Sequence, residues 1–204
     1  MKGRVLVIAG SDSGGGAGIQ ADIKTITALG GYAMTAVTAL TAQNSIAVVG
    51  VHKPPPAFVA DQIRVTLEDL GADAVKTGMM ADRPIIEAAA DALDAHASSI
   101  PWVVDPVIVS TSRDRLLDKD AEAALKVRLV SKAALVTPNR AEAEALTGLT
   151  VDNAAAMEVA GRALLEMGAG AALVTGGHGD GDTVTDVLFT AEGAERFESP
   201  RIDT

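Results

Sequence analysis

Short apolar runs of strand length alternate along this chain with longer stretches whose apolar residues recur at helical spacing. The first run, Arg4 to Ala9, precedes an amphipathic stretch from Ala17 to Leu29, which stops at two glycines. Glycine tolerates the left-handed backbone that follows a helix end, so this segment is predicted as a strand and a helix. Further apolar runs predict strands at residues 35–41, 48–53, 74–77, 102–105, 134–137, 171–175, 183–190 and 195–200.

Amphipathic stretches lie between most of these strands. A run of three prolines precedes a predicted helix that ends at Leu70, and Asp82 can cap the next helix. Strands that alternate with helices form parallel units covered on both faces, whereas the last two strands are predicted as an antiparallel pair. We predict one α/β domain over residues 1–204, with further helices at 82–96, 118–129, 139–147 and 152–167.

Composition narrows the classes of function. The chain has 204 residues and a net charge of −10, from 17 basic and 27 acidic residues. Nucleic acids are bound through clustered lysine and arginine, and no basic run is present, so a nucleic-acid partner is not expected. No apolar run approaches the roughly 20 residues of a membrane span, the N-terminus lacks a signal-peptide pattern, and cysteine is absent. We expect a cytoplasmic protein without a membrane partner.

A glycine-rich segment, SDSGGGAGIQADIK, follows the first predicted strand and opens the first helix. N–H groups at a helix start are free to bind anions and polar ligands. Gly14, Gly16 and Gly18 do not have the spacing of a dinucleotide-binding fingerprint, and the Gly-Lys-Ser/Thr of a Walker A loop is absent. The segment is either a ligand-binding turn of another type or a flexible connection.

Polar residues at the carboxyl ends of two further strands are candidates for binding, because open α/β sheets bind ligands there. In the sequence TAQN, which begins at Thr41, Gln43 offers a donor and an acceptor that match the edge of an aminopyrimidine; the alternative is a surface glutamine. Asp105, at the end of the strand at 102–105, can hold Mg²⁺ or its waters, or it can cap the next turn.

Two later segments carry further polar groups. In TPNRAEAEAL, Asn139 and Glu142 have the spacing of a capping box, and the same spacing places both on one helical face, where they can serve a metal-bound phosphate. In TGGHGDGDTVTDVLF, which begins at Thr175, a strand leads two glycines and His178 into a polar loop that can lie against a nucleotide. His178 is interpreted as a surface residue of that loop.

Together, the segments IAGSDSGGGAGIQADIKT, TALTAQN, KTGMM, VVDPVIVSTS and TPNRAEAEAL resemble, in order and spacing, the hydroxymethylpyrimidine kinase family of the ribokinase superfamily. The resemblance implies a ribokinase-like three-layer α/β/α sandwich with a mainly parallel central sheet. It implies an enzyme that uses ATP and Mg²⁺ to phosphorylate 4-amino-5-hydroxymethyl-2-methylpyrimidine and then its monophosphate, in thiamine biosynthesis. We also expect a homodimer.

The resemblance further implies roles for individual residues, with Gly10 and Asp22 near the hydroxymethyl group. No residue of this span is assigned as the catalytic base, for which Asp22 is the nearest candidate. The implied substrate-binding residues are Gly10, Asp22, Thr41, Gln43, Met79 and Val107. The implied nucleotide-binding residues are Asn139, Glu142, Thr175, Gly177 and Asp186, and the implied metal ligands are Asp105 and Glu142.

The sequence departs from the family pattern at three places. Thr175 stands where the family usually has lysine, and Arg113 stands where it often has glycine. The family continues into a Thr-His-Gly-Thr-Gly-Cys segment and a helix, which supply the anion hole and the catalytic residue, whereas this sequence ends at Thr204. We therefore expect that the C-terminal part of the domain is missing and that this span alone has little or no kinase activity.

Two other functions remain open at this point. A pyridoxal or pyridoxine kinase of the same fold also acts on a ring with a hydroxymethyl group, although Gln43 and the pair Met79 and Met80 favour the pyrimidine. A non-catalytic protein that keeps the pyrimidine pocket is the alternative from a different class.

Overall fold

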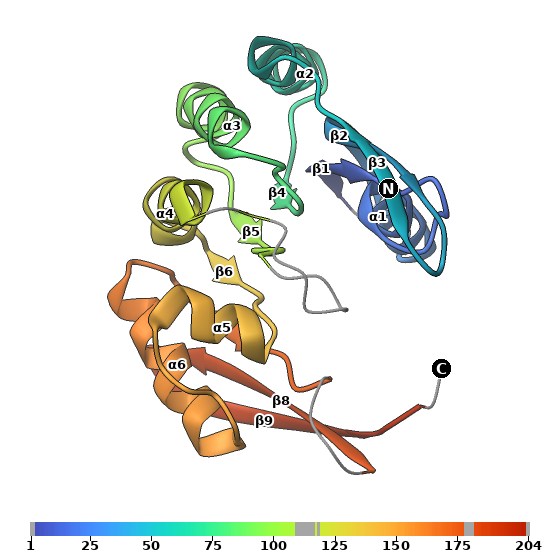
Figure 1. Ribbon diagram of the computed structural model, residues 1–204. Helices are drawn as coiled ribbons and strands as arrows, with labels where there is room; N and C mark the ends of the chain where they lie inside the picture. Colours follow the sequence, from blue (N-terminus) through green and yellow to red (C-terminus); the bar gives the residue numbers. More distant parts are fainter. Residues whose placement is uncertain (1–2, 109–116, 118, 178–181, 203–204) are drawn as a thin grey trace.

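The computed structural model of the chain describes residues 3–108, 117, 119–177 and 182–202. Its centre is one nine-stranded sheet in the order β3-β2-β1-β4-β5-β6-β7-β8-β9 (Figure 1). The six strands from β2 to β7 in this order run parallel, whereas β3 pairs antiparallel with β2, and β8 and β9 each pair antiparallel with the strand before. The strands are β1 Arg4–Ser11, β2 Tyr32–Gln43, β3 Val48–His52, β4 Ala74–Thr77, β5 Trp102–Val104, β6 Leu135–Val136, β7 Ala172–Val174, β8 Thr183–Thr190 and β9 Gly193–Pro200.

The helices lie where the apolar periodicity predicts them. The largest difference at an element end is in β2, which begins at Tyr32 rather than at residue 35 because Tyr32 pairs with Arg4 at the start of β1. The antiparallel pair near the end of the chain is also confirmed. The helices of the described residues are α1 Gly18–Ala28, α2 Pro56–Asp69, α3 Arg83–His96, α4 Lys119–Arg128, a 3-10 turn Val130–Lys132, α5 Arg140–Thr147 and α6 Ala154–Glu166.

The pleat of β1 divides its side chains between two hydrophobic clusters. Leu6 and Ile8 are fully buried in the larger cluster, which joins the sheet to α2, α3, α4, α5 and α6. Val7 and Ala9 are buried on the opposite face with Ile19 of α1. Figure 1 accordingly shows α1 on the other side of the sheet from α2, α3 and α4. Helices on both faces confirm the three-layer α/β/α sandwich with a mainly parallel sheet.

Two predicted helix caps are present. The Asp82 carboxylate accepts the Ile85 N–H at 3.1 Å and so begins α3. Asn139 forms the complete capping box of α5, because its side chain accepts the Glu142 N–H at 3.0 Å while Glu142 Oε2 accepts the Asn139 N–H at 2.9 Å. Each such cap satisfies N–H groups that would otherwise lack an intrahelical partner.

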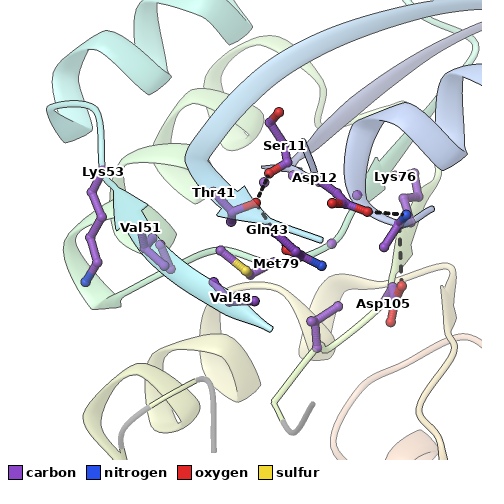
Figure 2. A pocket seen from close by; sticks show the side chains of 17 residues that line it. Ser11, Asp12, Thr41, Gln43, Val48, Val51, Lys53, Lys76, Met79 and Asp105 are labelled. Atoms are coloured by element: carbon purple, nitrogen blue, oxygen red, sulfur yellow. Dashed lines mark hydrogen bonds and ion pairs between the residues drawn. The ribbon is translucent and has the colours of Figure 1, made fainter. Parts of the chain in front are cut away.

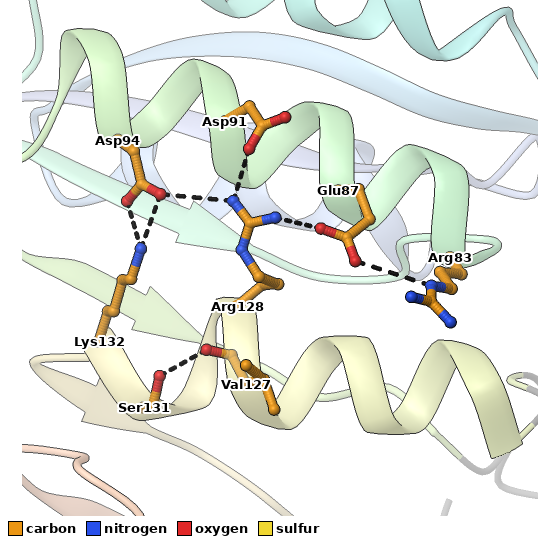
Figure 3. A network of polar contacts seen from close by, with 8 residues as sticks. All are labelled: Arg83, Glu87, Asp91, Asp94, Val127, Arg128, Ser131 and Lys132. Atoms are coloured by element: carbon orange, nitrogen blue, oxygen red, sulfur yellow. Dashed lines mark hydrogen bonds and ion pairs between the residues drawn. The ribbon is translucent and has the colours of Figure 1, made fainter.

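A network of charged side chains joins α3 to α4 and to the turn behind it (Figure 3). Arg128 binds Glu87, Asp91 at 2.6 Å and Asp94 at 3.4 Å, and Lys132 binds Asp94 at 2.6 Å. Single exposed ion pairs contribute little to stability, but one arginine shared among three carboxylates fixes the two helices side by side. The network lies on the helical layer and holds no group that faces the ligand pocket described below.

None of the helices in the described residues combines the length and apolar character that crossing a bilayer requires.

Candidate active site

A pocket of about 450 Å³ opens at the carboxyl ends of β1, β2, β4 and β5, with β3 as one wall. This is the edge where open α/β sheets bind ligands, and the volume suits a small organic molecule. Figure 2 shows side chains from these separate strands directed toward one space. The lining residues are Ala9, Gly10, Ser11, Asp12, Ala17, Gly18, Thr41, Gln43, Val48, Val51, Lys53, Lys76, Gly78, Met79, Ala81, Asp105 and Val107.

Six of the residues expected at a ligand site meet in this pocket, although they are spread over almost a hundred positions of sequence. They are Gly10, Thr41, Gln43, Met79, Asp105 and Val107. A side chain at Gly10 would approach the Met79 Cε to 3.1 Å, so the glycine leaves room for the methionine at the pocket wall. Met80, in contrast, is fully buried in the core and does not face a ligand. The structure brings the expected residues together, and their individual roles stay predictions.

Lys76, on the central strand β4, links two carboxylates at the pocket. Its ammonium nitrogen lies 3.1 Å from Asp22 Oδ2 of α1 and 3.4 Å from Asp105 Oδ2 after β5. Asp22 does not line the pocket itself and reaches it through this lysine. Burial raises the pKa of Asp105 above its ordinary value, although the positive charge of Lys76 acts in the opposite direction.

The glycine-rich loop is organised by Asp12 rather than left open for an anion. The Asp12 carboxylate is 6% exposed and accepts the backbone N–H groups of Gly14 at 2.8 Å, Gly16 at 2.9 Å and Ala17 at 2.8 Å. These three N–H groups precede α1, which begins at Gly18 without a side-chain cap, so the loop before the helix does not offer them to a ligand. The loop is also not a flexible connection, because one side chain fixes three of its N–H groups.

Replacement of Asp12 by asparagine is expected to lower stability in a pH-dependent way. Burial raises the pKa of Asp12, but the hydrogen bonds from Ala17, Gly14 and Gly16 together lower it below the ordinary value. A lowered folded-state pKa stabilises the protein above the unfolded-state pKa of about 3.9, and the contribution is lost as the pH falls through the folded-state pKa. Asparagine does not titrate in this range.

The measurement is urea unfolding of wild type and Asp12→Asn between neutral and acid pH. The difference in unfolding free energy should be largest near pH 7 and should close below about pH 4. A difference that stays constant across this range would contradict a stabilising role of the Asp12 charge.

Gln43 is held at one amide atom and presents the other to the pocket. Thr41 Oγ1 lies 3.1 Å from Gln43 Oε1 and 2.8 Å from the Ser11 carbonyl oxygen. The Gln43 backbone is fixed as well, because the Ser13 hydroxyl donates to its carbonyl at 2.7 Å and accepts from its N–H at 2.8 Å. These contacts join the end of β2 to the glycine-rich loop, as Figure 2 shows for Ser11, Thr41 and Gln43.

Two non-glycine residues with left-handed backbone lie at the pocket. Ala81 has φ of 63° and Val107 has φ of 42°, and both line the cavity. A branched residue rarely adopts such a conformation, and strained backbone in proteins gathers at ligand sites. Val107 stands two residues after Asp105, and its left-handed backbone places this part of the chain in the pocket wall.

The edge strand β3 supplies an apolar wall. Val48 and Val51 line the pocket and are each 51% exposed. The end of this strand is tied down by Lys53, whose ammonium donates to Asp82 at 2.9 Å. A ligand ring that covers these half-exposed apolar side chains removes apolar surface from water, which favours binding.

The residues expected to serve the nucleotide form a second group, outside this pocket. An isolated β-bridge joins Asn139, which follows β6, to Thr175, which follows β7, and the Thr175 N–H donates to the carbonyl oxygen of Pro138. Asp186 Oδ1 accepts the Gly176 N–H at 2.8 Å, while Arg201 donates to the Gly177 carbonyl at 2.8 Å. The second group of expected residues is thus also assembled by the fold. His178 and Arg113 lie outside the described residues.

The two expected metal ligands, Asp105 and Glu142, already have partners in the structure, and their role at a metal stays a prediction. Magnesium at phosphoryl-transfer sites keeps several waters and takes one or two protein carboxylates. Glu142 Oε1 already accepts the Ile108 N–H at 3.2 Å, and Asp105 is paired with Lys76. In the part of the chain that the structure describes, no three acidic, histidine or cysteine side chains converge on one point.

Sequence reasoning did not single out Lys76, Asp12 or Lys53 as site residues. A signal for Lys76 is present, because a lysine within a short strand of a sheet covered on both faces is unusual and calls for a partner. Asp12 carries no comparable signal, since an aspartate beside glycines is common in any turn.

The fold and the pocket define a ribokinase-like α/β protein with a cavity of small-molecule size at the carboxyl edge of its sheet. Its structure is similar to a phosphomethylpyrimidine kinase from Clostridium difficile, with a TM-score of 0.90 and 38% identity, over 97% of this chain and 85% of that one. The family model of phosphomethylpyrimidine kinase matches residues 12–204. The chain belongs to the phosphomethylpyrimidine kinase family.

Relatives with known names agree with this assignment. The chain is 45% identical to the hydroxymethylpyrimidine/phosphomethylpyrimidine kinase of Escherichia coli, over 98% of this chain and 75% of that protein. It is 48% identical to the thiamine biosynthesis bifunctional protein ThiED of Geobacter sulfurreducens, over 98% of this chain and 41% of that protein, so it spans less than half of that relative. The resemblance seen in the sequence motifs is confirmed.

A pyridoxal kinase is a structural neighbour as well. The ADP complex of Bacillus subtilis pyridoxal kinase has a TM-score of 0.88 and 34% identity, over 98% of this chain and 76% of that one. The relatives found by sequence carry higher identity and are named for the pyrimidine. The comparisons therefore do not favour the pyridoxal alternative.

Proposed function

We propose that this protein transfers the γ-phosphoryl group of ATP to 4-amino-5-hydroxymethyl-2-methylpyrimidine and to its monophosphate, as a step in thiamine biosynthesis. The observation that carries the proposal is the pocket, in which Gln43, Met79 and Val107 converge from three separate parts of the chain. The family assignment gives this pocket its substrate class. Gln43 matches the donor and acceptor edge of an aminopyrimidine, and the apolar walls suit the two faces of a ring.

Phosphoryl transfer depends mostly on positioning and on stabilisation of charge. In the proposal, the ring stands between Met79 and the β3 wall, with its hydroxymethyl group toward Gly10 and Asp22. Asp22 does not line the pocket, and it would act on the alcohol through Lys76, which it binds at 3.1 Å. The apolar lining around Val107 keeps water away from the alcohol.

The nucleotide is proposed to lie along the second group of residues, from Asn139 and Glu142 to Thr175, Gly177 and Asp186. ATP complexed with Mg²⁺ is the proposed cofactor, and the ion would neutralise phosphate charge when bound. Asp105 and Glu142 would hold the ion through its water shell.

Two further parts of the proposal concern the protein as a whole. The absence of cysteine suits a reducing compartment such as the cytoplasm. A homodimer is supported by β3, an edge strand whose Val48, Val49 and Val51 are all exposed, because such an edge offers both apolar surface and unpaired backbone groups to a second copy.

Calorimetric titration tests the substrate class directly. The protein should bind 4-amino-5-hydroxymethyl-2-methylpyrimidine more tightly than pyridoxal, because pyridoxal lacks the amino and ring-nitrogen edge that Gln43 matches. Tighter binding of pyridoxal to a folded sample would overturn the assignment in favour of the other vitamin kinase. ADP release in the presence of ATP, measured with the same compounds, then separates a kinase from a protein that only binds the pyrimidine.

A further inference from the structure

Lys76 is a charged residue in the middle of the central sheet. Its strand, β4, lies between β1 and β5, and its sequence neighbours Val75 and Thr77 are fully buried. Val75 belongs to the larger hydrophobic cluster, whereas Lys76 points to the opposite face of the sheet and lines the pocket. Its side chain keeps 24% exposure, so the ammonium is neither solvated as on a surface nor closed off from a ligand.

The surroundings of Lys76 are built to hold the ammonium at one point. Asp22 and Asp105 bind it from two different elements, at 3.1 and 3.4 Å. The absence of a side chain at Gly78 leaves room for the Lys76 ammonium. A side-chain carbon at this position would lie 3.1 Å from the Lys76 nitrogen and 3.0 Å from the Ala9 Cβ. Figure 2 shows Lys76 and Asp105 facing each other at the pocket.

Fold stability does not explain this arrangement. A partly buried ion triad must overcome the loss of hydration of three charges, and apolar residues of similar size are often as stabilising or more so. An ammonium group has three N–H donors; one is donated to Asp22 at 3.1 Å, and Asp105 lies 3.4 Å from the nitrogen as an ion-pair partner. The third donor is left for the pocket, into which Lys76 projects.

We propose that Lys76 is the residue that recognises the hydroxymethyl oxygen of the substrate, by donating its third N–H to that oxygen while Asp22 and Asp105 hold the ammonium in place. The inference rests on the proposed function and adds to it a residue that determines specificity. An alcohol oxygen accepts a charged hydrogen bond readily, and the same contact would orient the oxygen for transfer.

The test compares two ligands that differ by one oxygen. They are 4-amino-5-hydroxymethyl-2-methylpyrimidine and 4-amino-2,5-dimethylpyrimidine, which lacks the hydroxyl group. Lys76→Met should weaken binding of the alcohol by about 10-fold or more, the usual range for loss of a hydrogen bond to a charged group, while binding of the dimethyl compound changes by less than about 3-fold. Both constants are measured by calorimetry on the same samples.

Two variants accompany Lys76→Met. Lys132→Met removes another lysine that is paired with a carboxylate, outside the pocket, and should leave both affinities unchanged. Gly78→Ala keeps the charge of Lys76 but displaces its ammonium, so it should also weaken binding of the alcohol more than binding of the dimethyl compound. If Lys76→Met does not fold, because Asp22 and Asp105 lose their partner, Gly78→Ala carries the test.

The outcomes are distinct. A selective loss of affinity for the alcohol in either variant supports the inference. Equal loss of both ligands, or no loss of either, overturns it and leaves the proposed function intact, because the wild type still binds the pyrimidine. A folded wild type that binds neither compound overturns the proposed function and the inference with it.

Discussion

Replacement of Gly18 by alanine should remove pyrimidine binding and destabilise the fold. Gly18 has φ of +54°, and a side-chain carbon there would lie 2.4 Å from the Gly10 carbonyl oxygen. The left-handed backbone costs an L-residue about 1–2 kcal/mol. Forced overpacking adds about 1–3 kcal/mol, so a loss of roughly 2–5 kcal/mol in unfolding free energy is expected. The strain falls on Gly10 and Asp12, which both line the pocket.

The matched control is Gly16→Ala in the same loop. Gly16 has no left-handed backbone, and its side-chain carbon would meet Asp12 at an ordinary distance of 3.9 Å. Denaturant unfolding and pyrimidine titration of both variants separate the close approach at Gly18 from a general sensitivity of the loop. Equal effects at the two glycines would show that the contact between Gly18 and Gly10 is not what shapes the pocket.

Replacement of Gln43 by alanine should weaken pyrimidine binding about 5- to 150-fold and leave ATP binding almost unchanged. A ring edge that is buried without its partner loses about 1–3 kcal/mol. The Gln43 amide oxygen lies 3.1 Å from the Thr41 hydroxyl and the side chain lines the pocket, so alanine removes an amide group that is already oriented. Calorimetric titration with each ligand gives both dissociation constants.

Gln62→Ala is the control for Gln43→Ala. Gln62 on α2 exchanges two hydrogen bonds with the Val37 backbone and does not line the pocket, so its loss should affect stability without selective loss of the pyrimidine. A decrease confined to ATP affinity in Gln43→Ala, or an equal decrease for both ligands, would contradict the assigned role of Gln43.

The order of strands and helices could be predicted from the sequence because it depends on local periodicity. An apolar strand such as β1 and an amphipathic helix such as α3 can each be recognised within a short stretch of sequence. Caps are equally local, and so Asp82 and the pair of Asn139 and Glu142 were predicted correctly. The side-chain motifs were also sufficient for the family, which the comparisons confirm.

The pocket could be predicted only in part. Gly10, Gln43 and Asp105 stand at strand ends, and the general rule for open α/β sheets places ligands there. The rule does not say which strand ends meet, and Gly10, Met79 and Val107 entered as ligand contacts only through the family resemblance. The sequence also suggested that the glycine-rich loop offers free N–H groups, whereas Asp12 uses three of them.

By itself, the sequence determined the helices and strands of this protein, the class of its fold and the family to which it belongs. Periodicity, helix caps and motifs depend on residues that are close together in the sequence. Only the tertiary structure decided that Lys76 lies between Asp22 and Asp105, residues that stand 54 and 29 positions away from it in sequence. Parallel pairing of β1, β4 and β5 brings these charges together, and pairing of distant strands depends on packing across the whole sheet rather than on any local pattern.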